Sequence, residues 1–348
     1  MTERTFAPRA AYRGLAVYRN DAVPVEVDLG DNTNQFGTAP SALVTVREWT
    51  DDPSRYPTLT TAPLRQAIAE WLGVEPGQVL AGCGSNDLID STMRAFVDPG
   101  STVAFAAPTF VMTAHFARSN SLRPVPVLVR PDFQPDVDAI LATGAPLIYL
   151  ASPNNPAATL TEAGALDRLL DRAPGLVILD EAYAEFAGVS RVGEAARRGN
   201  VLVTRTFSKA WGLAGLRVGY AVGSAALIEE LEKARGPYKV NALAERAATA
   251  AVRHDRAWLA GIVAQVLEAR TWLLGALRDL GLAPLESAAN FVGLPVPDAP
   301  AAARHLAERG LGVRAFRNLP HVGDLLRITV GPIPIMERVT RALGELPR

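Results

Sequence analysis

Cysteine is nearly absent from this chain of 348 residues. Cys83 is the only one, which excludes an internal disulfide and is typical of a protein of the reducing cytosol. The four histidines are scattered without metal-ligand spacing, so we expect no metal site. No apolar run approaches the roughly 20 residues that a membrane helix needs, and the charged N-terminus lacks the apolar core of a signal peptide. We therefore expect a cytoplasmic protein without a membrane segment.

A surplus of basic residues is also missing. The formal net charge is -1, and no lysine–arginine cluster forms a local basic surface, so a nucleic-acid partner is not expected. Apolar residues make up 49% of the chain and charged residues 20%, which is ordinary for a globular enzyme. The length suffices for one large core or for two lobes. These values fit a soluble globular protein of one or two lobes.

Between residues 60 and 225, short apolar runs alternate with segments of helical periodicity. The pattern predicts strands at 79–81, 103–106, 125–129, 147–151, 176–179, 201–204 and 218–222. It predicts helices at 63–72, 87–96, 110–117 and 162–172. Strands that are apolar throughout and separated by helices indicate an α/β fold with a mostly parallel sheet, covered by helices on both faces. In such sheets, ligands bind at the carboxyl ends of the strands.

The pattern changes after residue 225 and predicts a second, smaller α+β domain. We expect helices at 226–233 and, with a break, at 241–280, then strands at 290–296 and 325–330, and helices at 300–308 and 334–346. The first forty residues have weak periodicity and much turn chemistry. We therefore predict an N-terminal arm at 1–40 that contacts the small domain or a partner subunit, a large domain at 41–235 and a small domain at 236–348.

The most informative segment surrounds Lys209. An apolar run leads to Thr206 and Ser208, then to the lysine, and Arg217 follows eight residues later. Apolar and small neighbours desolvate a lysine and favour its neutral amine, the form that attacks a carbonyl. Two hydroxyls and an arginine suit a phosphate. A carbonyl and a phosphate on one small molecule indicate pyridoxal 5'-phosphate. A surface Ser-Lys followed by an arginine also occurs by chance, so the remaining motifs must decide.

Two further motifs follow predicted strands. Gly82-Cys83-Gly84-Ser85-Asn86-Asp87 opens a helix, and its backbone N–H groups can bind an anion, although a plain turn has the same composition. Cys83 reads as a packing residue, because no histidine lies near it in the sequence. Asp180 ends an apolar run, and a buried carboxylate needs a cation such as a protonated pyridine nitrogen. A helix N-cap is the alternative reading of Asp180.

Four other residues could complete a ligand site. The Asn155 amide can donate to a phenolate-like oxygen, or it forms an Asx-Pro turn with Pro156. Phe110 could stack on a ring or belong to the core. Tyr183 lies three residues after Asp180, within reach of the same ligand. Arg327 sits in an apolar strand and needs an anion, either a substrate group or an internal carboxylate.

Taken together, these motifs resemble the fold-type-I pyridoxal-phosphate enzymes, and most closely the histidinol-phosphate aminotransferase branch. The resemblance extends from about residue 12 to residue 331. The order of its motifs is specific: Gly-x-Gly-Ser, Pro-Thr-Phe, Ser-Pro-Asn-Asn-Pro, Asp-Glu-Ala-Tyr, Ser-Lys-x7-Arg and Arg-x-Thr-Val-Gly.

The resemblance assigns roles toward the cofactor. Lys209 would bind it covalently, and Asp180 would pair with the pyridine nitrogen. Asn155 and Tyr183 would meet the phenolic oxygen, and Phe110 would stack on the ring. The phosphate would be held by Ser85, Asn86, Thr206, Ser208 and Arg217, together with Tyr56 of a neighbouring subunit. The same resemblance therefore implies a homodimer with shared active sites.

Toward the substrates, the resemblance implies that Arg327 and Arg314 bind an anionic group, with Tyr12 and Asn34 nearby. The substrates would be a small amino donor, L-histidinol phosphate in the first place, and a 2-oxo acid acceptor. The sequence departs from the family at Thr33, Gln35 and Pro332 and at Ala157-Ala158, all near the substrate. An aromatic or broad-specificity aminotransferase and a threonine-phosphate decarboxylase therefore stay open, as does a non-catalytic sensor domain.

Overall fold

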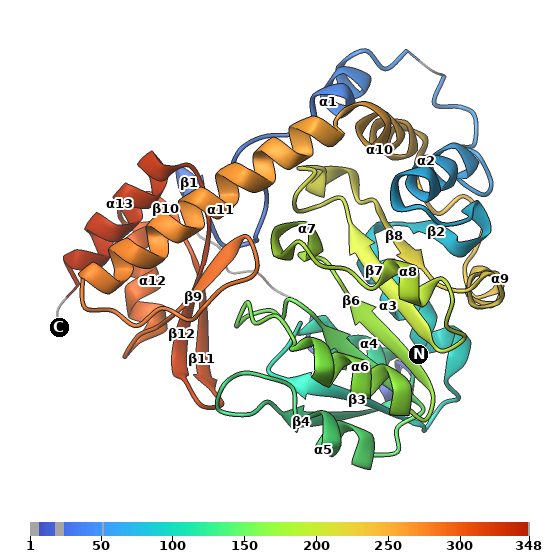
Figure 1. Cartoon of the computed structure of the whole chain (residues 1–348), viewed down its shortest axis with the longest axis horizontal. Helices are drawn as coiled ribbons and strands as arrows, with labels where there is room; N and C mark the ends of the chain where they lie inside the picture. Colours follow the sequence, from blue (N-terminus) through green and yellow to red (C-terminus); the bar gives the residue numbers. More distant parts are fainter. Residues whose placement is uncertain (1–6, 18–23, 51, 347–348) are drawn as a thin grey trace, which may run out of the picture.

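The computed structural model describes residues 7–17, 24–50 and 52–346. Its largest element is a seven-stranded sheet (Figure 1). In spatial order the strands are β2 (Val79–Gly82), β8 (Gly219–Val222), β7 (Val201–Thr206), β6 (Leu176–Asp180), β5 (Leu147–Ala151), β3 (Thr102–Ala107) and β4 (Arg123–Leu128). Only β8 runs antiparallel to its neighbours in this sheet. The mostly parallel sheet predicted from the sequence is confirmed.

Side chains alternate between the two faces of this sheet, and each face has its own core. In β6, Val177 and Leu179 belong to one core, whereas Leu176 and Ile178 belong to the other. The first core is covered by α2 (Ala62–Leu72), α5 (Val137–Ala142), α6 (Ala163–Arg172), α7 (Ala184–Ala187) and α8 (Val192–Ala195). The second is covered by α3 (Gly84–Phe96), α4 (Met112–Ser119) and α9 (Ala225–Lys233). Burial of both faces explains why the strands are apolar throughout.

A separate antiparallel sheet lies toward the C-terminus. Its strands, in spatial order, are β11 (Arg314–Leu319), β12 (Gly323–Thr329) and β9 (Phe291–Pro295). Around it lie α12 (Ala299–Ala307) and α13 (Ile333–Gly344). The short strands β1 (Val27–Asp28) and β10 (Leu311–Gly312) pair in parallel and attach the early chain to this region. The 24-residue helix α11 (Arg256–Asp279) runs between α10 and α13 (Figure 1).

The helical segment predicted at 241–280 does break, at Asp255. Helix α10 (Ala242–His254) ends there, and the Asp255 carboxylate accepts hydrogen bonds from Ser41 N (2.8 Å) and Ser41 Oγ (2.7 Å). Ser41 belongs to α1 (Pro40–Arg47), which packs on α10, as does α2. The domain boundaries at residues 40 and 235 stay a prediction. Within the described ranges there are also three short 3-10 helices: η1 (Ala10–Tyr12), η2 (Pro76–Gln78) and η3 (Ala214–Leu216).

Among the residues described, every helix is too short or too polar to cross a membrane.

Candidate active site

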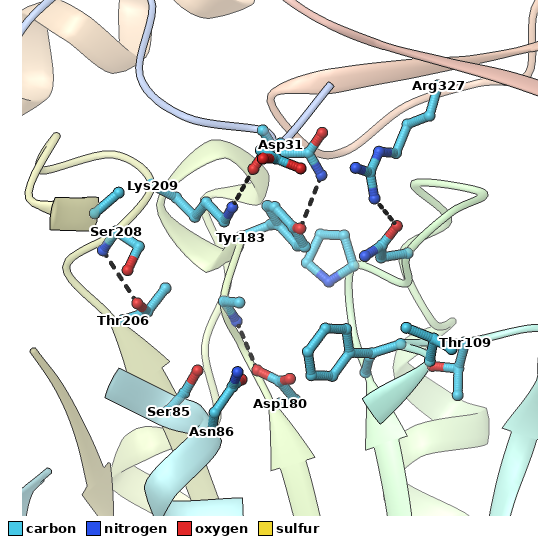
Figure 2. Close-up of a pocket in the computed structure, with 18 of the residues that line it drawn as sticks. Asp31, Ser85, Asn86, Thr109, Asp180, Tyr183, Thr206, Ser208, Lys209 and Arg327 are labelled. Carbon is cyan, nitrogen blue, oxygen red and sulfur yellow. Dashed lines mark hydrogen bonds between the residues drawn. The ribbon is translucent and has the colours of Figure 1, made fainter. Parts of the chain in front are cut away.

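A cavity of about 360 Å³ opens where the strands of the large sheet end. Because β2 and β7 are both antiparallel to β8, they run in the same direction, and their carboxyl ends meet those of β6, β5 and β3 at one edge. Most of the predicted site residues line this cavity (Figure 2). They are Ser85, Asn86, Phe110, Asn155, Asp180, Tyr183, Thr206, Ser208, Lys209, Arg217, Arg314 and Arg327.

Three predicted residues lie elsewhere. Tyr56 is 80% exposed, and its ring stacks on Tyr238 at 4.5 Å between centroids, beside a second depression. Asn34 donates from Nδ2 to the Ala210 carbonyl (2.8 Å) and so contacts the backbone next to the lysine rather than the cavity. Tyr12, in η1, is 47% exposed. The roles of all three stay predictions, and that of Tyr56 concerns a second subunit.

Lys209 follows β7 and extends into the cavity. Its Nζ donates a hydrogen bond to the Asp31 carbonyl at 2.7 Å (Figure 2). Burial lowers the pKa of Lys209 from 10.5 to about 7, and the positive charges of Arg327 and Arg217 act in the same direction. The carboxylates of Asp31 and Asp180 oppose this shift. Near pH 7 a large fraction of the amine is therefore neutral and able to attack a carbonyl or accept a proton.

Asp180 is the last residue of β6, the central strand. Its Oδ2 accepts a hydrogen bond from the Tyr149 hydroxyl (2.7 Å), and its Oδ1 accepts one from Ala182 N (3.1 Å). The side chain is 6% exposed, and burial raises the pKa of Asp180 above its usual value. No ion pair to Asp180 forms within the described part of the chain. The carboxylate keeps acceptor capacity for a cation that enters the cavity.

The opposite side of the cavity is built to hold an anion. Helix α3 begins at Gly84, where φ is +78°, and its first turn presents Ser85 and Asn86. A Cβ at Gly219 would lie 2.6 Å from Ser85 N, so only glycine permits this approach of β8 to the helix. A Cβ at Gly84 would lie 3.0 Å from Arg217 Nη2, so the guanidinium sits against the helix N-terminus. Free N–H groups, hydroxyls and an arginine together suit a phosphate.

Tyr183, which follows β6 of the large sheet, forms a hydrogen bond with the N-terminal part of the chain. Its hydroxyl accepts a hydrogen bond from Asn32 Nδ2 at 3.0 Å (Figure 2). Asn32 is 1% exposed and adopts a positive φ of +53°, a conformation that asparagine tolerates. The backbone N–H of Asn32 donates to Thr329 Oγ1 (3.1 Å). The phenol is therefore fixed over the cavity by residues from both ends of the chain.

Arg327 is fixed from several sides. Its Nη1 donates to Asn155 Oδ1 (2.7 Å), and its Nη2 donates to the Gly30 carbonyl. The guanidinium carbon lies 5.6 Å from the ring centroid of Phe291 and 5.5 Å from that of Phe316. Since Oδ1 of Asn155 accepts from the arginine, its Nδ2 is left as a donor on a cavity-lining residue.

Arg314 is the cross-strand partner of Arg327 in the β11–β12 pair, and both line the cavity. Like charges placed opposite each other on neighbouring strands repel, and an anion between them relieves the repulsion. This region of the cavity is therefore suited to a substrate that carries a carboxylate or a phosphate.

Several cavity-lining residues were not predicted, among them the polar residues Asp31, Asn32, Thr109 and Tyr149. Tyr149 could have been recognised from the sequence, because a hydroxyl inside an aliphatic buried strand needs a hydrogen-bond partner. Thr109 stood inside the Pro-Thr-Phe motif, where its Oγ1 donates to Asn154 Oδ1 (2.7 Å). Asp31 and Asn32 lie in the first forty residues, for which the sequence indicated only turn chemistry.

Comparison with known proteins agrees with this geometry. Aminotransferase class I and II is the family that matches residues 24–346. The chain belongs to this aminotransferase family. A histidinol-phosphate aminotransferase of Cereibacter sphaeroides is 39% identical, covering 92% of this chain and 91% of its own. One of Jannaschia sp. is 37% identical over 97% and 98% of the two chains. The resemblance inferred from the motifs is confirmed.

Solved structures agree with the fold of this aminotransferase. Histidinol-phosphate aminotransferase from Sinorhizobium meliloti, solved in complex with pyridoxal-5'-phosphate, superposes with a TM-score of 0.88 at 28% identity, covering 98% of both chains. Aspartate aminotransferase from Thermus thermophilus, at 22% identity, superposes with a TM-score of 0.78 over 92% of this chain and 91% of that one. The predicted fold class is thereby confirmed.

Proposed function

We propose that this aminotransferase binds pyridoxal 5'-phosphate and moves the amino group of L-histidinol phosphate to 2-oxoglutarate. The observation that carries the proposal is the joint presence of Lys209 and Asp180 in one cavity, the amine with a lowered pKa and the carboxylate buried without an ion pair to any described residue. The names of the most similar relatives and the cofactor held by the Sinorhizobium meliloti enzyme support it.

The cavity residues fit such a cofactor. The buried carboxylate of Asp180, which forms no ion pair with the described residues, suits a protonated ring nitrogen, and the N-terminus of α3 with Arg217 suits the phosphate. Lys209 suits the carbonyl carbon. Tyr183 and the free donor of Asn155 suit the phenolic oxygen. When bound, the cofactor supplies an electron-withdrawing ring that stabilises negative charge at the substrate carbon bearing the amino group.

The chain's own residues supply the proton transfers. With a pKa of about 7, the Lys209 amine can take a proton from the substrate carbon that bears the amino group and can deliver it to an adjacent atom. The hydrogen bond to the Asp31 carbonyl keeps this amine on one side of the cavity. Asp180 stays ionised opposite the cation that it binds, and Tyr183 keeps its proton because burial raises the pKa of its hydroxyl.

Substrate choice rests on the cationic side of the cavity. Arg314 and Arg327 together suit a dianionic phosphate monoester better than a single carboxylate. 2-Oxoglutarate, which has two carboxylates, can use the same arginines after the donor product leaves. Because both half-reactions use the same anion site, the enzyme can accept an amino donor and an amino acceptor of different shape.

We also propose that the enzyme acts as a homodimer. The ring of Tyr56 is held on the surface by stacking on Tyr238, and a large exposed aromatic of this kind suits burial against a second copy. Size-exclusion chromatography with light scattering should give twice the mass of the 37.0 kDa chain. A monomer of full activity would contradict this part of the proposal.

The deciding experiment is a donor panel with 2-oxoglutarate as acceptor. We expect the highest kcat/KM with histidinol phosphate and much lower values with phenylalanine, tyrosine and threonine phosphate. Preference for an aromatic amino acid would refute the donor and keep the reaction class. Release of carbon dioxide from threonine phosphate without an acceptor would refute amino transfer. Lys209→Ala should lose both the visible absorbance of the bound cofactor and turnover, whereas the matched control Lys233→Ala should keep both.

A further inference from the structure

Tyr149 is a buried residue of the cavity wall whose hydroxyl contacts the catalytic carboxylate. It stands in the middle of β5, where its neighbours are aliphatic, and is 0% exposed. In the β5–β6 register, Ala151 faces Asp180 and Tyr149 faces Ile178. Alternate residues share a face of a sheet, so Tyr149 and Asp180 project on the same side and lie diagonally to each other. Their hydroxyl and carboxylate meet at 2.7 Å.

The phenol is fixed as a donor in this contact. Burial raises the pKa of Tyr149 well above its ordinary value, and the charge of Asp180 acts in the same direction. The hydroxyl therefore stays protonated and donates to Oδ2. Among the groups that affect Asp180, the Tyr149 hydroxyl, the Ala182 N–H and the Thr204 side chain favour its ionised form, with Tyr149 the strongest of the three, whereas burial and the negative charge of Glu181 favour its protonated form. Tyr183 and Lys209 are the other titratable groups that act on it.

A bridging proton between a carboxylate and a ring nitrogen can reside on either partner. In a desolvated site the neutral pair, with the proton on the carboxyl group, gains relative to the ion pair. A hydrogen bond that stabilises the carboxylate shifts the proton toward the nitrogen. Tyr149 supplies such a bond from the side of the sheet.

We propose that Tyr149 is a positioning residue of the active site: its hydroxyl holds Asp180 as an oriented carboxylate, so that a proton shared with the cofactor's ring nitrogen stays on the nitrogen. This inference rests on the proposed cofactor function. The contact acts through Asp180, since the hydroxyl of Tyr149 is already committed to Oδ2.

The test compares wild-type holoenzyme with Tyr149→Phe and Tyr220→Phe. Tyr220 is the matched control, a tyrosine of β8 that is equally buried but does not line the cavity. Each protein is loaded with ¹⁵N-labelled pyridoxal 5'-phosphate, and the ring-nitrogen chemical shift reports where the proton lies. We expect a protonated nitrogen in wild type and in Tyr220→Phe. Tyr149→Phe loses one charge-assisted hydrogen bond. The ratio of neutral to protonated ring nitrogen should therefore rise about tenfold or more in this variant.

Kinetics separate positioning from general damage. We expect kcat of Tyr149→Phe to fall about tenfold or more with little change in KM, because the arginine site is untouched. A folded Tyr149→Phe whose nitrogen is as protonated as in wild type would overturn the inference. If this variant does not fold, 3-fluorotyrosine at position 149 replaces it. At the pH where the wild-type nitrogen is half protonated, this more acidic phenol must raise the protonated fraction, and no rise would overturn the inference.

Wild type itself separates this inference from the proposed function. If the unaltered protein takes up no labelled cofactor, the proposed function fails before any variant is measured. If it binds the cofactor and transfers amino groups while the Tyr149 variants give the wild-type nitrogen signal, only the role of Tyr149 fails.

Discussion

The lowered pKa of Lys209 predicts an unusual reactivity profile for cofactor-free protein. In this experiment only the pH is varied. At pH 7 an amine with a pKa of about 7 is half neutral, whereas a lysine of pKa 10.5 is neutral in only about one molecule in 3,000. Because the neutral form is the nucleophile, labelling of Lys209 should rise with pH only up to about pH 7 and then level off.

The chain is well suited to this measurement, because it contains three lysines, Lys209, Lys233 and Lys239. Trace acetylation with acetic anhydride at a series of pH values, followed by mass spectrometry, reports each amine separately. Lys233 is the internal reference, since its hydrogen bond with Glu230 raises its pKa. Its labelling should still climb about tenfold per pH unit at pH 9. A Lys209 profile that climbs in parallel with that of Lys233 through pH 9 would refute the assignment.

Three other changes have defined outcomes. Arg327→Met removes a positive charge that lowers the lysine pKa, so the Lys209 labelling midpoint should move to higher pH, and KM for anionic donors should rise at least about tenfold. A midpoint that stays in place would contradict this. Gly219→Ala places a Cβ 2.6 Å from Ser85 N, so cofactor affinity in an absorbance titration should fall; unchanged affinity would argue against the phosphate site. Gly212→Ala combines a φ of +70° with a Cβ 2.3 Å from the Gly37 carbonyl, and urea unfolding should show a loss of about 2 kcal/mol or more.

Much of the large sheet could be predicted because its signals are local. The strand predicted at 147–151 coincides with β5, and an aliphatic run needs no partner to be recognised. The β11 strand was not predicted. Its sequence, Arg-Ala-Phe-Arg-Asn-Leu, has no regular alternation because it is a half-exposed edge strand. Helix α1 was missed for a similar reason, since Ala42 is its only fully buried residue.

The same distinction separates the predicted and the missed site residues. Lys209, Asp180 and Asn155 lie at or just after the carboxyl ends of strands, and the rule that ligands bind there groups them without any tertiary information. The contact of Asn32 with Tyr183 joins residues 151 positions apart, and no local pattern encodes it. Helix α3 starts at Gly84 rather than at the predicted residue 87, because the positive φ of that glycine turns the chain early and adds Ser85 to the helix.

The carbonyls of Gly30 and Asp31 are consecutive acceptors on one short loop, the first bonded to Arg327 and the second to Lys209. An anion that attracts the Arg327 guanidinium acts, through the hydrogen bond to Gly30, on the same backbone segment that accepts from the Lys209 amine. Arg327 and Lys209 are therefore bonded to neighbouring peptide units, so a displacement of this loop changes the hydrogen bonds of both side chains at once.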